Sequence, residues 1–317
     1  MFKLAHISDV HLGPLPDLSL RELASKRITG FVNWHRNRVR HLFPGTLDCL
    51  MKDIEKRDPD HLAITGDLVN LASSLEIEAV TEWLTEAGEP DEISVVPGNH
   101  DAYVPGAYEK STHAWYPFMR GDDAPSGWVK KHACFPYMRV RGSVAIIGCS
   151  TFPYMRVRGS VALIGCSTAV ATPPFAASGY FGPRQARETV NLLRRAGEAG
   201  LFRIVMIHHP PIRGATSMHK RMIGIRRFAA TISAGGAEMV LHGHTHLNSL
   251  YWLKGHAGPV PVIGIASASQ GPGGSKPVAA YNLFSVDGEP GDWRLTRERY
   301  AINPDATGVV LAETTFF

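Results

Sequence analysis

Short apolar runs alternate with amphipathic stretches along most of the chain, and this alternation is the strongest constraint on its fold. Six short runs have the character of buried strands: residues 3–7, 61–64, 93–96, 204–207, 239–241 and 260–265. Three longer stretches have the spacing of helices: residues 47–56, 75–87 and 183–199. Strands that alternate with helices predict an α/β fold in which helices enclose a sheet.

A polar motif directly follows five of these apolar runs. In chain order the motifs are Asp9-Val10-His11, Gly66-Asp67, Gly98-Asn99-His100-Asp101, His208-His209-Pro210-Pro211 and Gly243-His244-Thr245-His246. In α/β folds, ligands bind beyond the carboxyl ends of the strands. We therefore expect the functional site of this chain to be built from these motifs.

The first two motifs have the donor atoms of a metal site. Asp9 and His11 supply one oxygen and one nitrogen, a mixture that suits iron, manganese or zinc. Asp67 can bridge two cations with its two carboxylate oxygens, and the preceding Gly66 allows the backbone to approach closely. Each motif alone is also common as an ordinary surface turn.

The later motifs are more specific. The amide oxygen of Asn99 is a plausible neutral ligand, and the adjacent His100 can face a substrate. In an extended segment, His244 and His246 would lie on the same side of the backbone. Any one of these histidines could be an ordinary buried residue, but two carboxylates, an asparagine and several histidines that all follow strands predict a metal site.

In this order the five motifs resemble the calcineurin-like metallophosphoesterase superfamily, over roughly residues 1–290. The resemblance implies an α/β fold in four layers, with two mixed β-sheets packed as a sandwich and flanked by helices. It also implies two transition-metal ions, divalent or trivalent, with manganese, iron and zinc all suitable. One ion would be held by Asp9, His11, Asp67 and His246. The other would be held by Asp67, Asn99, His208 and His244.

The resemblance also implies roles for the neighbouring residues. His209 would lie behind the ligands rather than on a metal. Two cations can clamp the phosphate oxygens and activate a bridging water, which attacks phosphorus. His100 would donate a hydrogen bond or proton to the departing oxygen, and Asp101 would orient His100.

Specificity is expected in the segments between the motifs. Residues 21–43 are basic and amphipathic, so Arg36, Arg38 and Arg40 are candidate substrate-binding residues, and the segment could also rest on a membrane surface. The alternative is a solvated helix whose apolar stripe packs on the core. Residues 103–128 could cover the phosphate pocket, residues 214–227 form another basic stretch, and residues 271–277 are expected to be a plain connection.

Three functions remain open on the sequence. The leading one is hydrolysis of a phosphodiester, with cyclic nucleotides as one choice. The second is hydrolysis of a lipid-linked or sugar-nucleotide pyrophosphate, such as a lipid A precursor. The third is a non-catalytic, metal-binding scaffold that assembles through a duplicated hairpin, residues 135–151 and 152–168. The expected partner is a small phosphorylated substrate, and the net charge of +4 gives no reason to expect stable nucleic-acid binding.

Residues 135–151 are repeated at once as residues 152–168, with Ile146 against Leu163 as the one difference. We expect a single domain over residues 1–317 that contains this duplication. Each copy predicts a strand, a turn and a second strand, but a sheet normally offers one place for such a hairpin. One copy should fill that place, while the other loops out, extends a sheet edge or joins two molecules into a homo-oligomer. The alternative is an inert insertion.

The start of the chain has no basic stretch followed by a long apolar one, so we expect no signal peptide. Four cysteines are scattered without CxxC spacing: Cys49, Cys134, Cys149 and Cys166. This usage predicts reduced thiols and a cytoplasmic protein.

Overall fold

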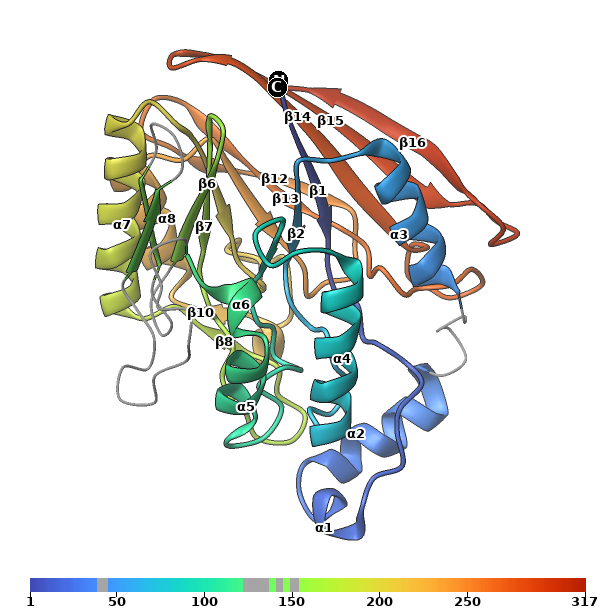
Figure 1. Ribbon diagram of the computed structural model, residues 1–317. Helices are drawn as coiled ribbons and strands as arrows, with labels where there is room; N and C mark the ends of the chain where they lie inside the picture. Colours follow the sequence, from blue (N-terminus) through green and yellow to red (C-terminus); the bar gives the residue numbers. More distant parts are fainter. Residues whose placement is uncertain (39–44, 122–136, 141–144, 149–153) are drawn as a thin grey trace.

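Two six-stranded sheets form the centre of the computed structural model, which describes residues 1–38, 45–121, 137–140, 145–148 and 154–317 (Figure 1). In the first sheet the strand order is β16-β15-β14-β1-β2-β3. Its strands are β1 (Phe2–Ile7), β2 (His61–Ile64), β3 (Ile93–Val95), β14 (Ala280–Glu289), β15 (Asp292–Ile302) and β16 (Val309–Phe316). β1, β2 and β3 are parallel, and the other pairs are antiparallel.

The second sheet has the order β12-β13-β11-β9-β7-β6. Its strands are β6 (Tyr154–Arg158), β7 (Val161–Gly165), β9 (Phe202–Met206), β11 (Met239–His242), β12 (Ser249–Lys254) and β13 (Pro259–Gly264). The four strands β7, β9, β11 and β13 are parallel, and the two edge pairs are antiparallel. The short strands β8 (Gly179–Tyr180) and β10 (Met222–Ile223) pair separately.

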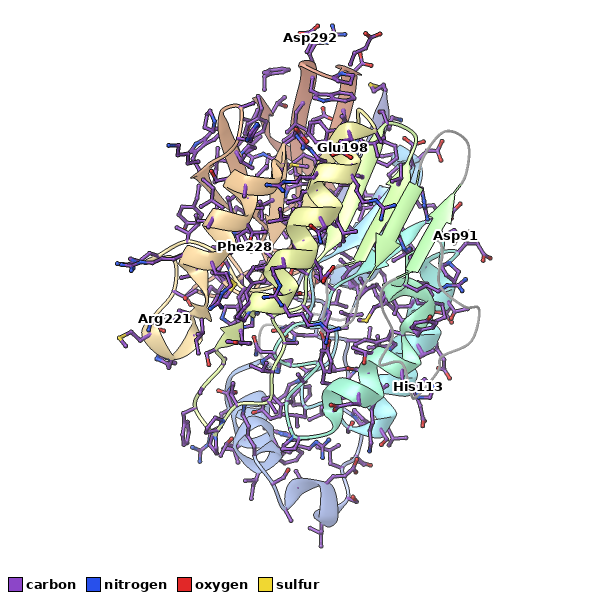
Figure 2. The ribbon with its side chains drawn as sticks, turned by 90° about the vertical axis from the view of Figure 1, so that its left-hand side faces the viewer. Asp91, His113, Glu198, Arg221, Phe228 and Asp292 are labelled. Carbon is purple, nitrogen blue, oxygen red and sulfur yellow. The ribbon has the colours of Figure 1, made fainter. Side chains whose placement is uncertain are left out.

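Helices cover the outer face of each sheet and complete four layers. α3 (Thr46–Arg57), α4 (Ser74–Ala87), α5 (Ala107–Ala114) and α6 (Tyr116–Met119) lie with the first sheet, and α7 (Pro183–Glu198) and α8 (Ile225–Gly235) lie with the second. Figure 2 shows α7 and α8 side by side, with Phe228 on α8. The predicted four-layer sandwich of two mixed sheets is confirmed.

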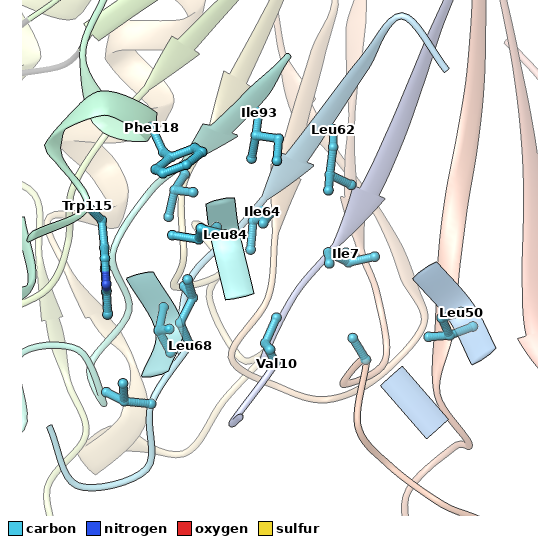
Figure 3. Packing of buried hydrophobic residues seen from close by; sticks show 14 of the residues in the cluster. Ile7, Val10, Leu50, Leu62, Ile64, Leu68, Leu84, Ile93, Trp115 and Phe118 are labelled. Atoms are coloured by element: carbon cyan, nitrogen blue, oxygen red, sulfur yellow. The ribbon is translucent and has the colours of Figure 1, made fainter. Parts of the chain in front are cut away.

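Three large apolar cores hold the layers together. One fills the space between the sheets and includes Leu4 and Ile204. A second joins the first sheet to its helices, where Ile64 packs with Leu84 (Figure 3). The third joins the second sheet to α7 and α8. The six predicted strands and three predicted helices are all present, with ends that differ by at most two residues.

The carboxyl ends of the parallel strands point to the end of the sandwich where α1 (Leu20–Leu23) and α2 (Arg27–Asn33) lie, in the lower part of Figure 1. Both chain termini lie at the opposite end (Figure 1). A π-helical turn, Trp34–Arg38, follows α2 directly. The N-terminal segment therefore reaches the end of the fold where all five polar motifs emerge.

Both copies of the duplicated segment form a hairpin, as predicted. The first copy forms β4 (Tyr137–Val140) and β5 (Ala145–Gly148), and among the described residues these two strands pair with each other and not with either large sheet. The second copy forms β6 and β7, and β7 pairs with β9 in the second sheet. Tyr137 opposes Gly148 in one hairpin and Tyr154 opposes Gly165 in the other, so the two copies have the same register. The second copy therefore occupies the place in the large sheet.

A fully buried arginine anchors the second copy. The guanidinium of Arg156 donates to the carbonyl oxygens of Arg120 (2.7 Å), Pro90 (2.6 Å), Pro117 (2.8 Å) and Ile93. These four backbone acceptors engage four of the five N–H groups of the guanidinium and link β6 to α6 and β3. This network explains how a charged side chain is accommodated in the interior.

The described residues also bear on membrane spans and on the cysteines. In the part of the chain that the structure describes, no helix is long and apolar enough to cross a membrane. Cys49 and Cys166 are free thiols, as predicted, and Cys166 is buried. Cys134 and Cys149 lie outside the described residues.

Candidate metal centre

The five polar motifs meet at the carboxyl ends of β1, β2, β3, β9 and β11. Side-chain ligand atoms approach one another within 4.8 Å in several overlapping groups of three. The residues in these groups are Asp9, His11, Asp67, His100, His208, His209, His244 and His246. Asn99 joins them, because its Oδ1 lies 3.3 Å from Nε2 of His208. The structure thus brings together every residue that the sequence predicted as a ligand.

Asp9 is buried and held from two directions. Its Oδ2 accepts a hydrogen bond from the backbone amide of His244 (2.9 Å), and its carbonyl accepts one from Ser267 Oγ (2.7 Å). Its Oδ1 lies 3.1 Å from Nε2 of His246 but makes no hydrogen bond of standard geometry with the described residues. A buried carboxylate oxygen without such a bond requires another partner, and a cation would provide it.

Asp67 lies between the two expected ligand sets. Its Oδ2 is 3.3 Å from Nε2 of His208 and 4.0 Å from Nε2 of His11. Its Oδ1 accepts a hydrogen bond from the backbone amide of His100 (2.7 Å). Oδ2 of Asp67 therefore lies near one histidine of each ligand set, His208 and His11.

Backbone carbonyls fix the orientation of three candidate histidine ligands. A carbonyl can only accept, so the ring nitrogen that contacts it carries the hydrogen. Nδ1 of His11 donates to Val69 O (3.1 Å), and Nδ1 of His208 donates to Thr65 O (2.7 Å). Nε2 of His244 donates to the carbonyl of Lys220 (2.9 Å). When the ring is neutral, the other nitrogen carries the lone pair that a metal ligand must offer.

The backbone at the site is strained. Nine described non-glycine residues have positive φ. Five of them are candidate ligands, with φ between 43° and 68°: Asp9, His11, Asp67, His244 and His246. This conformation is costly for residues with a Cβ and gathers at functional sites, where the surrounding structure enforces it.

The charges of the site favour cations. Burial raises the pKa of Asp67, but the nearby imidazoles of His208, His100 and His11 outweigh burial and hold that pKa well below its ordinary value. Burial lowers the pKa of His208, yet the carboxylate of Asp67 raises it to about 9. Burial raises the pKa of Asp9 too, but the imidazole of His246 outweighs it and the net shift is downward. Both buried carboxylates are therefore ionised at neutral pH and need positive charge beside them. A metal ion that binds Nε2 of His208 would displace the proton that the raised pKa places there.

His209 lies behind the ligands. Its Nε2 donates to Ala177 O (3.1 Å), so its Nδ1 accepts from Thr168 Oγ1 (2.7 Å). Its ring centroid is 4.3 Å from that of His244. Because both ring nitrogens are engaged, His209 can support His244 but has no lone pair to offer a metal. Thr168 is the last residue of the second hairpin copy.

The expected partnership between Asp101 and His100 is wrong. The carboxylate of Asp101 accepts four backbone hydrogen bonds instead, from Asp67 (2.9 Å), Leu68 (2.9 Å), Val69 (3.2 Å) and Gly98 (2.7 Å). It therefore ties the loop after β2 to the loop after β3. His100 is oriented through Nδ1, which donates to Asn70 O (2.5 Å).

The candidate substrate residues Arg36, Arg38 and Arg40 are not brought into the site by the described structure. Arg36 is exposed and makes no hydrogen bond or ion pair with a described residue. The side chain of Arg38 and the whole of Arg40 lie outside the described residues. From the same basic segment it is Lys26 that reaches the site, where its Nζ lies 4.5 Å from the ring centroid of Tyr103.

The glycine-rich loop at 271–277 was expected to be a plain connection, yet it reaches the site. Nζ of Lys276 donates to the carbonyl of Thr245 (2.8 Å), which lies between the two histidines of the last motif. The contacts of Lys276 and Lys26 join segments that are distant in sequence, so no local pattern distinguishes these lysines from solvated ones.

Comparison with known proteins agrees with this geometry. The sequence pattern of the family described as calcineurin-like phosphoesterase matches residues 2–248. A dimetal phosphatase from Danio rerio has a similar structure, with a TM-score of 0.58, 11% identity and coverage of 98% of each chain. The purple acid phosphatase PPD1 from yellow lupin is also similar, with a TM-score of 0.53 and 10% identity. This alignment covers 99% of the present chain and 53% of the lupin protein, about half its length. No curated protein sequence matches.

Proposed function

The chain belongs to the calcineurin-like phosphoesterase family, and from this premise we propose that it is a two-metal enzyme that hydrolyses a phosphodiester. The observation that carries the proposal is the convergence of two ionised carboxylates with the lone pairs of carbonyl-oriented histidines. Such a donor set fits manganese, iron or zinc. Cyclic nucleotides are one class of small diester that this reaction would accept.

The residues divide into two ligand sets that share one carboxylate. Asp9, His11 and His246 would hold one ion, and Asn99, His208 and His244 would hold the other, with Asp67 between them. When bound, the two ions would neutralise the phosphate charge and supply an activated water.

The remaining roles belong to side chains that need not bind metal. His100 is held through Nδ1 by Asn70 O, so Nε2 is the atom that would donate a proton to the departing oxygen. Asp101 fixes the two loops that carry Asp67 and Asn99.

The test is hydrolysis of bis(p-nitrophenyl) phosphate and p-nitrophenyl phosphate by metal-free protein reconstituted with manganese, iron or zinc. We expect metal-dependent cleavage of the diester that is lost in His246→Ala and Asn99→Ala. His256→Ala is the matched control, because His256 is exposed in the turn between β12 and β13. Preferential cleavage of the monoester would count against a diesterase. Two bound ions per chain without turnover would favour the scaffold hypothesis.

A second candidate substrate is a lipid-linked or sugar-nucleotide pyrophosphate, and one observation favours it. Apolar side chains are exposed on segments that contact the site: Ile28 on α2, Phe175 (85% exposed) and Met218 (75% exposed). Phe175 lies in the 172–176 turn that Lys26 holds, and Met218 lies two residues before Lys220, whose carbonyl binds His244. These residues could receive an acyl chain, and the segment that carries Ile28 could also contact a membrane surface.

The two candidates differ in their products. A pyrophosphatase would release two phosphorylated products from a sugar nucleotide and would prefer an acylated form of it. Mass spectrometry of the products from a sugar nucleotide with and without an acyl chain distinguishes this reaction from diester cleavage. We infer that the partner in either case is a small phosphorylated molecule rather than a nucleic acid.

A further inference from the structure

The helix α2 is fixed to the edge of the metal centre by specific contacts. The guanidinium of Arg27 donates to the carbonyls of Leu71 (2.9 Å) and Ala72 (2.7 Å), just beyond the Asp67 motif. Gly30 lies directly on Tyr103, because a Cβ at position 30 would be 2.4 Å from the Tyr103 hydroxyl. α2 is therefore part of the wall of the site.

Lys26 joins three segments at this wall. Its Nζ donates to Thr172 Oγ1 (2.9 Å) and to the carbonyl of Ala176 (3.3 Å). The same ammonium lies over the ring of Tyr103, 4.5 Å from its centroid. An ammonium has three hydrogens, and two of them are used by Thr172 and Ala176. Lys26 therefore contacts protein groups, and its role is to connect these segments rather than to bind phosphate.

Tyr103 in turn packs against His100. The two rings are stacked, with centroids 5.3 Å apart and planes at 17°. The edge of His11 also contacts the His100 ring, with 4.9 Å between centroids. Asn70 O holds Nδ1 of His100, and the stacked tyrosine constrains the plane of the ring.

We propose that Lys26 is a positioning residue that acts through Tyr103 to hold His100 in place for proton donation to the leaving oxygen. The proposal rests on the role given to His100 in the proposed function. A cation over an aromatic ring stabilises that ring in one position, and burial strengthens the attraction. Loss of Lys26 would leave the metal ligands in place but allow Tyr103 and His100 to move.

The experiment compares esters that differ in their need for a proton donor. p-Nitrophenolate leaves without much help, whereas phenolate, which is more basic, needs protonation. In Lys26→Met, we expect kcat for diphenyl phosphate to fall by about tenfold while kcat for bis(p-nitrophenyl) phosphate changes much less. KM and metal content should stay unchanged. Lys26→Arg keeps a cation over the ring and should behave like the wild type.

Tyr103 provides an independent variant. Tyr103→Leu removes the ring and should reproduce the selective loss of Lys26→Met, whereas Tyr103→Phe keeps the ring and should not. Equal loss on both esters, or a change confined to KM, in Lys26→Met would overturn the proposal.

His100→Ala distinguishes a failure of the Lys26 proposal from a failure of the role assigned to His100. A loss in His100→Ala that is selective for diphenyl phosphate, without one in Lys26→Met, overturns the Lys26 proposal alone. Equal loss on both esters in His100→Ala would remove the assigned role of His100, and the Lys26 proposal with it.

Discussion

Gly98 lies against the carboxylate of Asp67, so closely that a Cβ at position 98 would be 2.2 Å from Asp67 Oδ1. The two residues belong to loops that follow neighbouring parallel strands, β2 and β3. The carboxylate between the two ligand sets can occupy its place only because residue 98 has no side chain.

Gly98→Ala should therefore displace Asp67 and weaken metal binding. We expect a loss of metal affinity and activity at least as large as the roughly 10- to 100-fold caused by disturbing groups that support a ligand. Metal titration followed by mass spectrometry measures it. Gly258→Ala is the matched control, because a Cβ there would meet nothing within 4 Å. Normal metal content in Gly98→Ala would show that the loop after β3 can move to accommodate the added Cβ.

Asp101→Asn should lower stability more than an ordinary surface change. Its two carboxylate oxygens accept four backbone hydrogen bonds, and an amide nitrogen would face two of those donors instead. Unsatisfied buried donors cost about 1–3 kcal/mol each, so the free energy of unfolding should fall by about 2–5 kcal/mol. Urea denaturation measures this change, with the exposed Asp292→Asn as control. A loss below 1 kcal/mol would show that water or rearrangement replaces the carboxylate.

Arg156→Met should destabilise the second hairpin copy by about 3 kcal/mol, because four carbonyl acceptors lose a buried donor. The duplication supplies the control: Arg139 is the equivalent residue of the first copy, and Arg139→Met should change the unfolding free energy little. If Arg139→Met were the more harmful, the first copy would be the one in the sheet. A double variant worse than the sum of its parts would show that either copy can fill the place.

Deletion of either copy should leave a folded, metal-binding protein. Removal of residues 135–151 or of residues 152–168 gives chains that differ only by leucine or isoleucine at one position. A single hairpin is enough to supply the contacts that Thr168 and Arg156 make and the strand that pairs with β9. Both shortened chains should therefore match the full protein in thermal midpoint and metal content. Analytical ultracentrifugation should show the same oligomeric state. A dimer that dissociates on deletion would instead support assembly through the extra hairpin.

Stability should depend on pH through His61. Burial, reinforced by Arg156 and Arg158, holds the pKa of His61 well below its ordinary value. In the unfolded chain His61 therefore binds a proton near pH 6.5, whereas in the folded chain it does not. The free energy of unfolding consequently falls as the pH drops below this value. His61→Gln should reduce the slope of unfolding free energy against pH by about 1.4 kcal/mol per unit there. His256→Gln, at an exposed position, should not. Equal slopes for wild type and His61→Gln would refute the assignment.

The elements of the fold were largely predictable, because local pattern determines them. The strand at residues 61–64 contains the apolar run Leu62–Ile64, and α4 begins with a capping box between Ser73 and Glu76. The ligand residues were predictable for a related reason: parallel strands bring their carboxyl ends together, so motifs that follow such strands must meet. The division of the strands into two sheets came from the resemblance rather than from periodicity.

The sequence by itself determined which residues could bind metal and which segments are strands and helices, since both follow from short-range pattern and side-chain chemistry. Only the tertiary structure decided what Asp101 binds, which hairpin copy joins the sheet, and which cation of the basic segment reaches the site. Each of these depends on contacts between residues far apart in the chain, such as Lys26 with Ala176 and Arg156 with Pro90. Two hairpins that differ at one position, Ile146 against Leu163, have nearly the same local preferences, so their connections to the rest of the fold distinguish them.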